Sequence, residues 1–333
     1  MMNTPLVELR GISKLFTRKL DFTTRMAGRM GFQVNEETVH AVQDVDLKID
    51  SGTVVGLVGE SGCGKSTLGR ILAGIHQPTA GSVAFSGQVV ADMSMLEKMD
   101  YTLAVQMIFQ DPFSSLNPRH KVRRIISEAP QVHKLWESGE VDKKLNNIMQ
   151  RVGLDSAFKH RYPHQFSGGQ RQRIGIARAL AVNPRFIVCD EAVASLDVSI
   201  QAQILNLFMR LRDELNLTYL FISHDLGVVK HLSDRVAIMY LGRIVESAPT
   251  DELFAEPNHP YTRALLAEIP NVDVRRREFE PIAGEIPSPL NPPSGCVFHP
   301  RCPVAMDRCR EEIPQLSAIT SHRMSACHLN DQA

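Results

Sequence analysis

The chain has 333 residues, and its 37 Lys and Arg side chains balance 37 Asp and Glu side chains, so the formal net charge is zero. This length suffices for one large domain with an appendage, and a neutral chain lacks the broad basic charge of a typical nucleic-acid-binding protein. No apolar run reaches the roughly 18 residues of a membrane-spanning helix, and the first residues do not read as a secretory signal. We therefore expect a cytosolic protein that meets a membrane only through partners.

Apolar periodicity predicts strands and helices that alternate along the chain. Short apolar, β-branched runs predict strands over residues 6–15, 41–49, 53–58, 186–189 and 218–222. Apolar residues at helical spacing predict helices over residues 65–75 and 198–215. This alternation indicates an α/β fold with a parallel sheet.

Three segments interrupt that alternation. Residues 17–39 form a basic insertion without a clear period, and residues from about 111 to 180 have helical spacing without a strong strand. Beyond residue 250 the sequence becomes rich in proline, which predicts a boundary followed by an extended, irregular tail. We therefore expect a domain over residues 1–250, with a helical subdomain at about 111–180, and a C-terminal extension over residues 251–333.

Residues 59–66 read Gly-Glu-Ser-Gly-Cys-Gly-Lys-Ser and fit the phosphate-loop pattern G-x-x-x-x-G-K-[ST]. Glycines let the backbone turn its N–H groups toward phosphate oxygens, and the N-terminus of the next helix adds partial positive charge. Lys65 is expected to reach the β- and γ-phosphates, and the Ser66 hydroxyl to ligate Mg²⁺. The residues expected to bind the nucleotide here are Gly59, Ser61, Gly62, Cys63, Gly64, Lys65, Ser66 and Thr67.

Two carboxylates, Asp190 and Glu191, end the predicted strand over residues 186–189. The carboxyl ends of parallel strands border the ligand crevice of an open α/β sheet. We therefore assign Asp190 to Mg²⁺, through water, and Glu191 to the attacking water as general base.

A further anion site is predicted at the start of the helix expected over residues 171–181. The residues before this helix are Ser167, Gly168, Gly169 and Gln170. A serine and two glycines at a helix start supply a cap and free N–H groups. With the phosphate loop and the acidic pair, this segment resembles the signature of ATP-binding-cassette (ABC) ATPases. The resemblance implies a P-loop NTPase fold with an antiparallel β subdomain and an inserted helical subdomain. It also implies that the signature binds the ATP of a second subunit, so that ATP closes a dimer and hydrolysis reopens it.

Single residues match other elements of that family. Gln110 corresponds to the loop glutamine that senses Mg²⁺ and the attacking water, and His224 to the switch histidine that contacts the γ-phosphate. The resemblance thus adds Gln110 to Ser66 and Asp190 as Mg²⁺ ligands. The D-loop corresponds to Ser195, Leu196 and Asp197.

An aromatic ring is expected to stack on adenine, since any base offers a π face. Phe16, near the end of the first predicted strand, is our candidate. Phe22 and Phe32, inside the insertion over residues 17–39, are alternatives.

Four further segments are similar to the ATPases of oligopeptide, dipeptide and nickel importers: residues 111–119, 259–266, 284–289 and 295–303. The long first insertion and Cys189 before Asp190 look most like the F-type ATPase subunit of a dipeptide or oligopeptide permease. The resemblance implies an ATPase that powers import of peptides or related small solutes from the cytoplasmic face of the plasma membrane. Its implied partners are a second, homologous ATPase subunit, two permeases and, indirectly, an extracytoplasmic solute-binding protein.

Cys296, Cys302, Cys309 and Cys327 are separated by five, six and seventeen residues. Zinc sites favour closer cysteine pairs, whereas four thiolates are able to hold a 4Fe-4S cluster. Members of the resembled group carry such a cluster here, which makes it the leading interpretation. Zinc and unligated thiols remain alternatives, with His299 and His328 as alternative ligands.

One other class of function competes with transport. A soluble ABC ATPase acting on nucleic acid or ribosomes would share the nucleotide motifs. Such chains generally carry long coiled-coil insertions or two cassettes, whereas this chain has one cassette, no net charge and an importer-type tail. The sequence therefore favours the transporter subunit.

Overall fold

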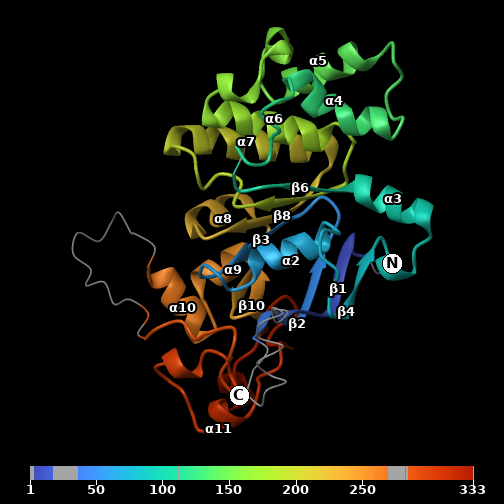
Figure 1. Ribbon diagram of the computed structural model, residues 1–333. Coiled ribbons are helices and arrows are strands. Elements are labelled where there is room, and N and C mark those ends of the chain that lie inside the picture. Colours follow the sequence, from blue (N-terminus) through green and yellow to red (C-terminus); the bar gives the residue numbers. More distant parts are fainter. Residues whose placement is uncertain (1–3, 18–36, 112, 269–281, 283, 333) are drawn as a thin grey trace, which may run out of the picture.

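The computed structural model describes residues 4–17, 37–111, 113–268, 282 and 284–332 (Figure 1). These residues form two β-sheets. The larger sheet has the strand order β11 (Ser317–Ala318), β12 (Met324–Ser325), β10 (Arg243–Pro249), β9 (Arg235–Tyr240), β3 (Val54–Val58), β8 (Thr218–Ser223), β7 (Phe186–Asp190) and β6 (Val105–Ile108).

The centre of the larger sheet is parallel. β3 pairs in parallel with β8 and β9, and β7 pairs in parallel with β6 and β8. Every residue of β3, β7 and β8 is buried. One face of these strands packs on α2 (Lys65–Leu72), and the other packs on α7 (Val198–Leu215) and, at β3, on α8 (Leu226–Leu232). Strands covered on both faces read as continuous apolar runs. The predicted parallel α/β sheet is confirmed, and α7 has the predicted bounds.

The smaller sheet is antiparallel. It contains β1 (Val7–Thr17), β2 (Thr38–Ile49), β4 (Ala80–Phe85) and β5 (Gln88–Val89), in the order β2-β1-β4-β5. Its buried face shares a core with α2, and a 3₁₀ turn η1 (Val90–Asp92) and α3 (Met95–Ala104) lead from it back to β6. The antiparallel β subdomain implied by the family resemblance is therefore present.

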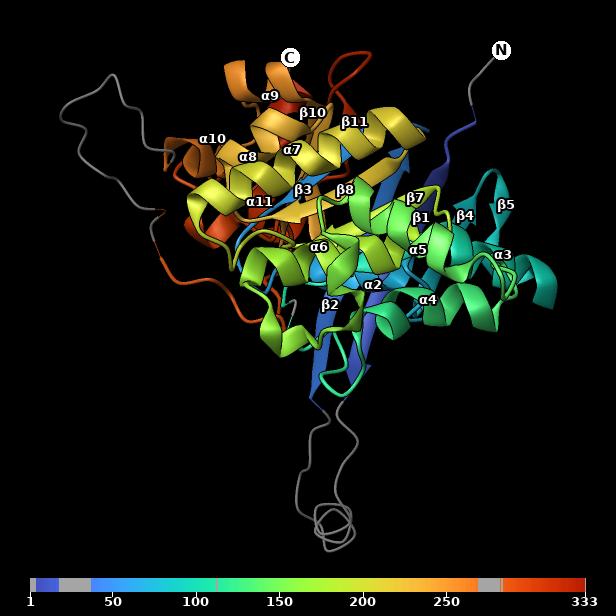
Figure 2. The ribbon, with the colours of Figure 1, turned by 90° about the horizontal axis from the view of Figure 1, so that it is seen from above.

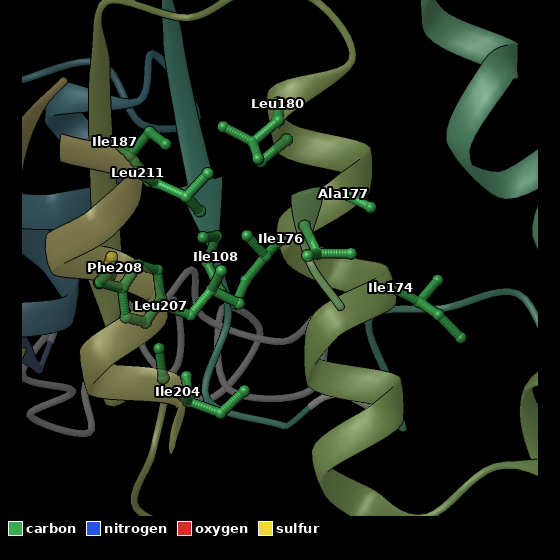
Figure 3. Packing of buried hydrophobic residues seen from close by; sticks show 14 of the residues in the cluster. Ile108, Ile174, Ile176, Ala177, Leu180, Ile187, Ile204, Leu207, Phe208 and Leu211 are labelled. Atoms are coloured by element: carbon green, nitrogen blue, oxygen red, sulfur yellow. The ribbon is translucent and has the colours of Figure 1, made fainter. Parts of the chain in front are cut away.

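Helices fill the chain between β6 and β7. They are α4 (Val122–Val132), α5 (Val141–Arg151), the 3₁₀ turns η2 (Ser156–His160) and η3 (Pro163–Gln165), and α6 (Gly168–Leu180). No strand occurs among the described residues of this segment. In both views α6 lies beside α7 (Figures 1 and 2). Ile176 and Leu180 of α6 and Leu207 and Leu211 of α7 gather around the sheet residue Ile108 (Figure 3). The predicted helical subdomain is confirmed, and its core continues into the sheet.

The C-terminal extension contains regular elements, so the expected irregular tail is confirmed only in part: residues 284–298 form no helix or strand, whereas other described segments do. It holds α9 (Thr250–Ala255), α10 (Pro260–Ala267), η4 (His299–Arg301), α11 (Arg308–Glu311) and η5 (His328–Gln332), besides β11 and β12. Pro260 starts α10 rather than breaking it, because a proline at the first helical position loses no intrahelical bond. Burial lowers the pKa of His259 to about 4, so its neutral Nδ1 accepts the Tyr261 N–H and caps this helix.

The remaining helix, α8 (Leu226–Leu232), follows β8 and is capped by Asp225. Among the helices of the described ranges, none combines the length and apolar character needed to cross a bilayer.

Candidate nucleotide-binding site

The phosphate loop joins β3 to α2, as the sequence predicts, and two of its glycines lie against neighbouring backbone. A Cβ atom on Gly59 would lie 2.0 Å from the Met239 carbonyl oxygen. A Cβ on Gly64 would lie 2.1 Å from the Ala41 carbonyl oxygen, and Gly64 has φ +106. Only glycine fits these two positions, so the fold fixes the loop at the N-terminus of α2.

Lys65 is buried inside this loop, with 4% of its surface exposed. Its Nζ donates to the carbonyl oxygens of Gly59, at 2.7 Å, and Glu60, at 2.9 Å. The loop thus surrounds a cation with its own carbonyl groups. An ammonium beside the positive end of α2 makes the loop attractive to anions.

The end of β7 lies beside the start of α2. The Ser66 hydroxyl donates to Asp190 Oδ1 at 2.7 Å, so two of the three expected Mg²⁺ ligands are in direct contact. Burial raises the pKa of Asp190, while the hydrogen bond from Ser66 opposes that rise. A cation at this carboxylate would favour its charged form.

Glu191 lies at the meeting point of three strand ends. Gln110, two residues beyond β6, donates from Nε2 to Glu191 Oε2 at 2.5 Å. His224, directly after β8, places Nδ1 3.4 Å from Glu191 Oε1. Glu191 has φ +47, a region that side-chain-bearing residues rarely adopt and that recurs at functional sites. The sequence-predicted base, glutamine and histidine are therefore brought together.

A cleft of about 350 Å³ opens over the phosphate loop. Phe16 lines it, is 39% exposed and packs edge-on against His76 with ring centroids 5.6 Å apart. Phe22 and Phe32, the alternative adenine-stacking residues, lie outside the described residues. The lining residues are Phe16, Val39, Ala41, Ser61, Gly62, Gly64, Lys65, Ser66, Thr67, Gln110, Glu191 and Pro289.

Pro289 is a lining residue that sequence reasoning missed. It comes from the C-terminal extension, and its carbonyl oxygen accepts the His40 N–H of β2 at 3.0 Å. The only available signal was its place in residues 284–289, a segment singled out for its resemblance alone. Gly59, Cys63, Asp190 and His224, by contrast, were assigned to the site but do not line the cleft itself.

The signature residues lie outside the cleft lining. Ser167 caps α6, since its hydroxyl accepts a hydrogen bond from the Gln170 N–H. The side-chain oxygen of Gln170 in turn accepts a hydrogen bond from the Ser167 N–H. The helix therefore begins at Gly168, three residues before the predicted start. Ser167 and Gly168 are exposed, so their polar groups face outward from this chain.

The D-loop and the first turn of α7 pack on the signature. A Cβ on Gly169 would lie 2.4 Å from Ile200 Cγ2 of α7, and one on Gly168 would lie 3.5 Å from Leu196 Cδ2 of the D-loop. Asp197 directly precedes α7 without a side-chain capping bond, and Ser195 precedes Leu196 in the turn before it. Signature and D-loop thus form one surface.

The four C-terminal cysteines share one neighbourhood. The pKa of Cys296 is raised to about 11, mainly by burial and in part by the neighbouring Cys309, Cys327 and Cys302. Within the described part of the chain, no three His, Cys, Asp or Glu side chains are arranged to hold a metal ion. Both ring nitrogens of His328 have partners in this structure, Asp331 and the Glu312 carbonyl oxygen.

Comparisons with known proteins agree with this geometry. Residues 42–194 match the ABC transporter family, and residues 245–309 match the oligopeptide/dipeptide transporter C-terminal region family. The oligopeptide transport ATP-binding protein AppF of Bacillus subtilis is 48% identical over 97% of both chains. The dipeptide transport ATP-binding protein DppF of Haemophilus influenzae is 44% identical over 98% of this chain and 97% of its own.

A solved structure shares the fold as well. The ATP-binding cassette MJ0796, in a dimeric post-hydrolysis state bound to ADP and Pi, superposes with a TM-score of 0.60 at 27% identity. The match covers 73% of this chain and 98% of that one. This shared fold and the relatives above, which align along nearly the whole chain, together identify the family. The chain belongs to the ABC transporter family, among the ATP-binding proteins that carry the oligopeptide/dipeptide transporter C-terminal region.

Proposed function

We propose that this protein is the ATP-hydrolysing subunit that powers import of peptides or related small solutes through a membrane permease. The observation that carries the proposal is one cleft lined by Lys65 and Glu191, with Asp190 bonded to Ser66 at its edge. The extension of the same chain matches the oligopeptide/dipeptide transporter family. The relatives named for peptide transport favour this function over a soluble ATPase acting on nucleic acid or ribosomes.

The donor set suits ATP with Mg²⁺. The hydroxyl of Ser66 and the carboxylate of Asp190 are oxygen donors in contact, and Gln110 adds an amide oxygen nearby, which matches the preference of Mg²⁺ for oxygen ligands. When bound, Mg²⁺ would neutralise charge on the phosphates. Lys65 would hold the β- and γ-phosphates, Glu191 would accept a proton from the attacking water, and His224 would contact the γ-phosphate.

The outward-facing signature supports action in a dimer. Ser167, Gly168, Gly169 and Gln170 would bind the ATP of a second, homologous ATPase subunit, and the D-loop would line the same interface. In the full complex, two permeases would hold this chain at the cytoplasmic face of the plasma membrane, and an extracytoplasmic solute-binding protein would act with it indirectly. Purification from membranes is expected to recover this chain with both permeases. ATPase activity stimulated instead by DNA or ribosomes would contradict the proposal.

A domain boundary near residue 250 is part of this proposal. We place the ATPase domain over residues 1–250, with its helical subdomain at about 111–180, and the extension over residues 251–333. The family matches at residues 42–194 and 245–309 are compatible with this boundary.

Phe16 is the proposed adenine-stacking residue, and its loss should weaken ATP binding. Stacking contributes about 1–3 kcal/mol per base, so Phe16→Ala is expected to raise the Kd for ATP by about tenfold or more. Equilibrium titration with a fluorescent ATP analogue would measure this. Phe22→Ala and Phe32→Ala are the comparison variants. If either weakens binding while Phe16→Ala does not, that phenylalanine is the stacking residue.

We further propose that Cys296, Cys302, Cys309 and Cys327 hold a 4Fe-4S cluster in a structural or regulatory role. The support is their shared neighbourhood, since Cys302, Cys309 and Cys327 all lie close enough to Cys296 to contribute to its raised pKa. A cluster is also larger than one ion, so its ligands stand further apart than those of a single metal. Iron and sulfide analysis of anaerobically purified protein is expected to find four of each per chain. Stoichiometric zinc without iron would refute the cluster.

A further inference from the structure

The C-terminal extension forms a buried ion pair with the phosphate loop. Arg301 Nη1 lies 2.8 Å from Glu60 Oε2, and Nη2 lies 3.1 Å from Glu60 Oε1. The Arg301 side chain is 5% exposed and that of Glu60 is 20% exposed. Two parallel bonds between a guanidinium and a carboxylate form the strongest and most directional kind of ion pair. The contact joins residues 241 positions apart in the sequence.

An aromatic cluster fixes the Arg301 side of this pair. Phe298, just before η4, packs on the rings of Tyr240 and Tyr261, with ring centroids 5.3 Å apart in both cases. The Tyr240 hydroxyl accepts a hydrogen bond from Arg301 Nη1 at 3.4 Å. The guanidinium therefore has little freedom to leave Glu60.

Glu60 is held through its backbone as well as its carboxylate. Its N–H donates to the Tyr261 hydroxyl of α10 at 3.0 Å, and its carbonyl oxygen accepts from Lys65 Nζ at 2.9 Å. Glu60 thus connects two residues of the extension, Arg301 and Tyr261, to the lysine at the centre of the loop.

The charge of Glu60 is otherwise unfavourable in this position. A carboxylate inside a loop that receives phosphates repels them, and the repulsion is little screened at a partly buried site. The hydrogen bonds and charge of Glu60 raise the pKa of Arg301, which keeps the guanidinium charged and the pair neutral.

From this geometry we infer that Arg301 is a positioning residue of the ATP site. It cancels the charge of Glu60 and anchors the loop, so the extension sets the affinity of the cassette for ATP. This role needs only the contacts above and holds whatever the four cysteines bind. It explains why an extension beyond the family-matched ATPase core packs under the phosphate loop.

The test is a double-mutant cycle on the full chain, with the Kd for Mg²⁺ and a non-hydrolysable ATP analogue measured by calorimetry. Arg301→Met is expected to raise the Kd about tenfold, because it leaves Glu60 unpaired. Glu60→Gln with Arg301→Met removes both charges, and the Kd is expected to return to within about threefold of wild type. Arg301→Lys keeps the charge and should bind almost as well as wild type.

Arg323→Met is the matched control. Arg323 pairs with the fully buried Glu246 at 2.9 Å, joining the extension to β10 away from the phosphate loop. It is expected to lower thermal stability without changing the Kd. Unchanged affinity in Arg301→Met overturns the inference, and so does equal weakening in the single and double variants. If Arg301→Met fails to fold, Arg301→Lys and the double variant still decide, since a tenfold loss in either contradicts charge compensation.

Discussion

Glu191→Gln is expected to lower the rate of ATP hydrolysis by at least about 10²-fold, the range attributed to a lost general base, while ATP binding is retained. The amide cannot accept the proton of the attacking water. It keeps the size of the side chain and an oxygen that accepts from Gln110, so the neighbouring geometry should persist. Phosphate release measures turnover, and equilibrium titration measures the affinity for ATP.

A second readout of the same variant concerns association. With hydrolysis blocked, ATP should hold this chain and its partner subunit in a closed complex that gel filtration detects. Glu214→Gln on the exposed face of α7 is the control, since among the described residues Glu214 pairs with Arg210 alone, at 3.7 Å. It should hydrolyse ATP at the wild-type rate. Substantial hydrolysis by Glu191→Gln would remove Glu191 from the base role.

Ser167→Arg is expected to impair the ATP site of the partner subunit by about 10²-fold, the scale for losing preorganised donors to an anion. A bulky cation at the exposed cap of α6 blocks the surface that would meet the second ATP. The measurement uses a heterodimer in which Glu191→Gln disables the ATP site of this chain. The remaining hydrolysis then reports only the ATP bound by the partner subunit.

The reciprocal heterodimer, with the partner's site disabled, should lose far less activity with Ser167→Arg. Ser94→Arg is a matched control, because Ser94 is also an exposed capping-box serine, at the start of α3. Ser94→Arg removes a comparable helix cap, which lowers stability by about 1 kcal/mol, and leaves the signature unchanged. Equal loss at both sites would rule out binding in trans.

Local patterns predicted most of the parallel sheet and the nucleotide motifs. α7 was predicted with its observed bounds because its apolar residues repeat at helical spacing. Gln110, Glu191 and His224 were assigned from motif order, and they meet because each follows a parallel strand of one sheet. Because the carboxyl ends of parallel strands lie along one edge of the sheet, residues that follow these strands come close together in space.

The contacts made by the extension could not be predicted in this way. Pro289 at the cleft and Arg301 at Glu60 lie more than 200 residues from their partners, and neither repeats with a period. The many prolines also suggested irregular backbone, although Pro260 begins a helix. These contacts depend on long-range packing, which leaves no local pattern in a single sequence.

The pairing of β12 with β10 has a consequence for how the protein is made. Glu246 and Ser247 of β10 pair with Ser325 and Met324, so the sheet that carries the phosphate loop gains a strand from a segment much later in the sequence. During synthesis, one edge of β10 therefore stays unpaired until β12 has been made. Exposed edges promote aggregation, so the nascent chain is expected to be prone to aggregate during this interval.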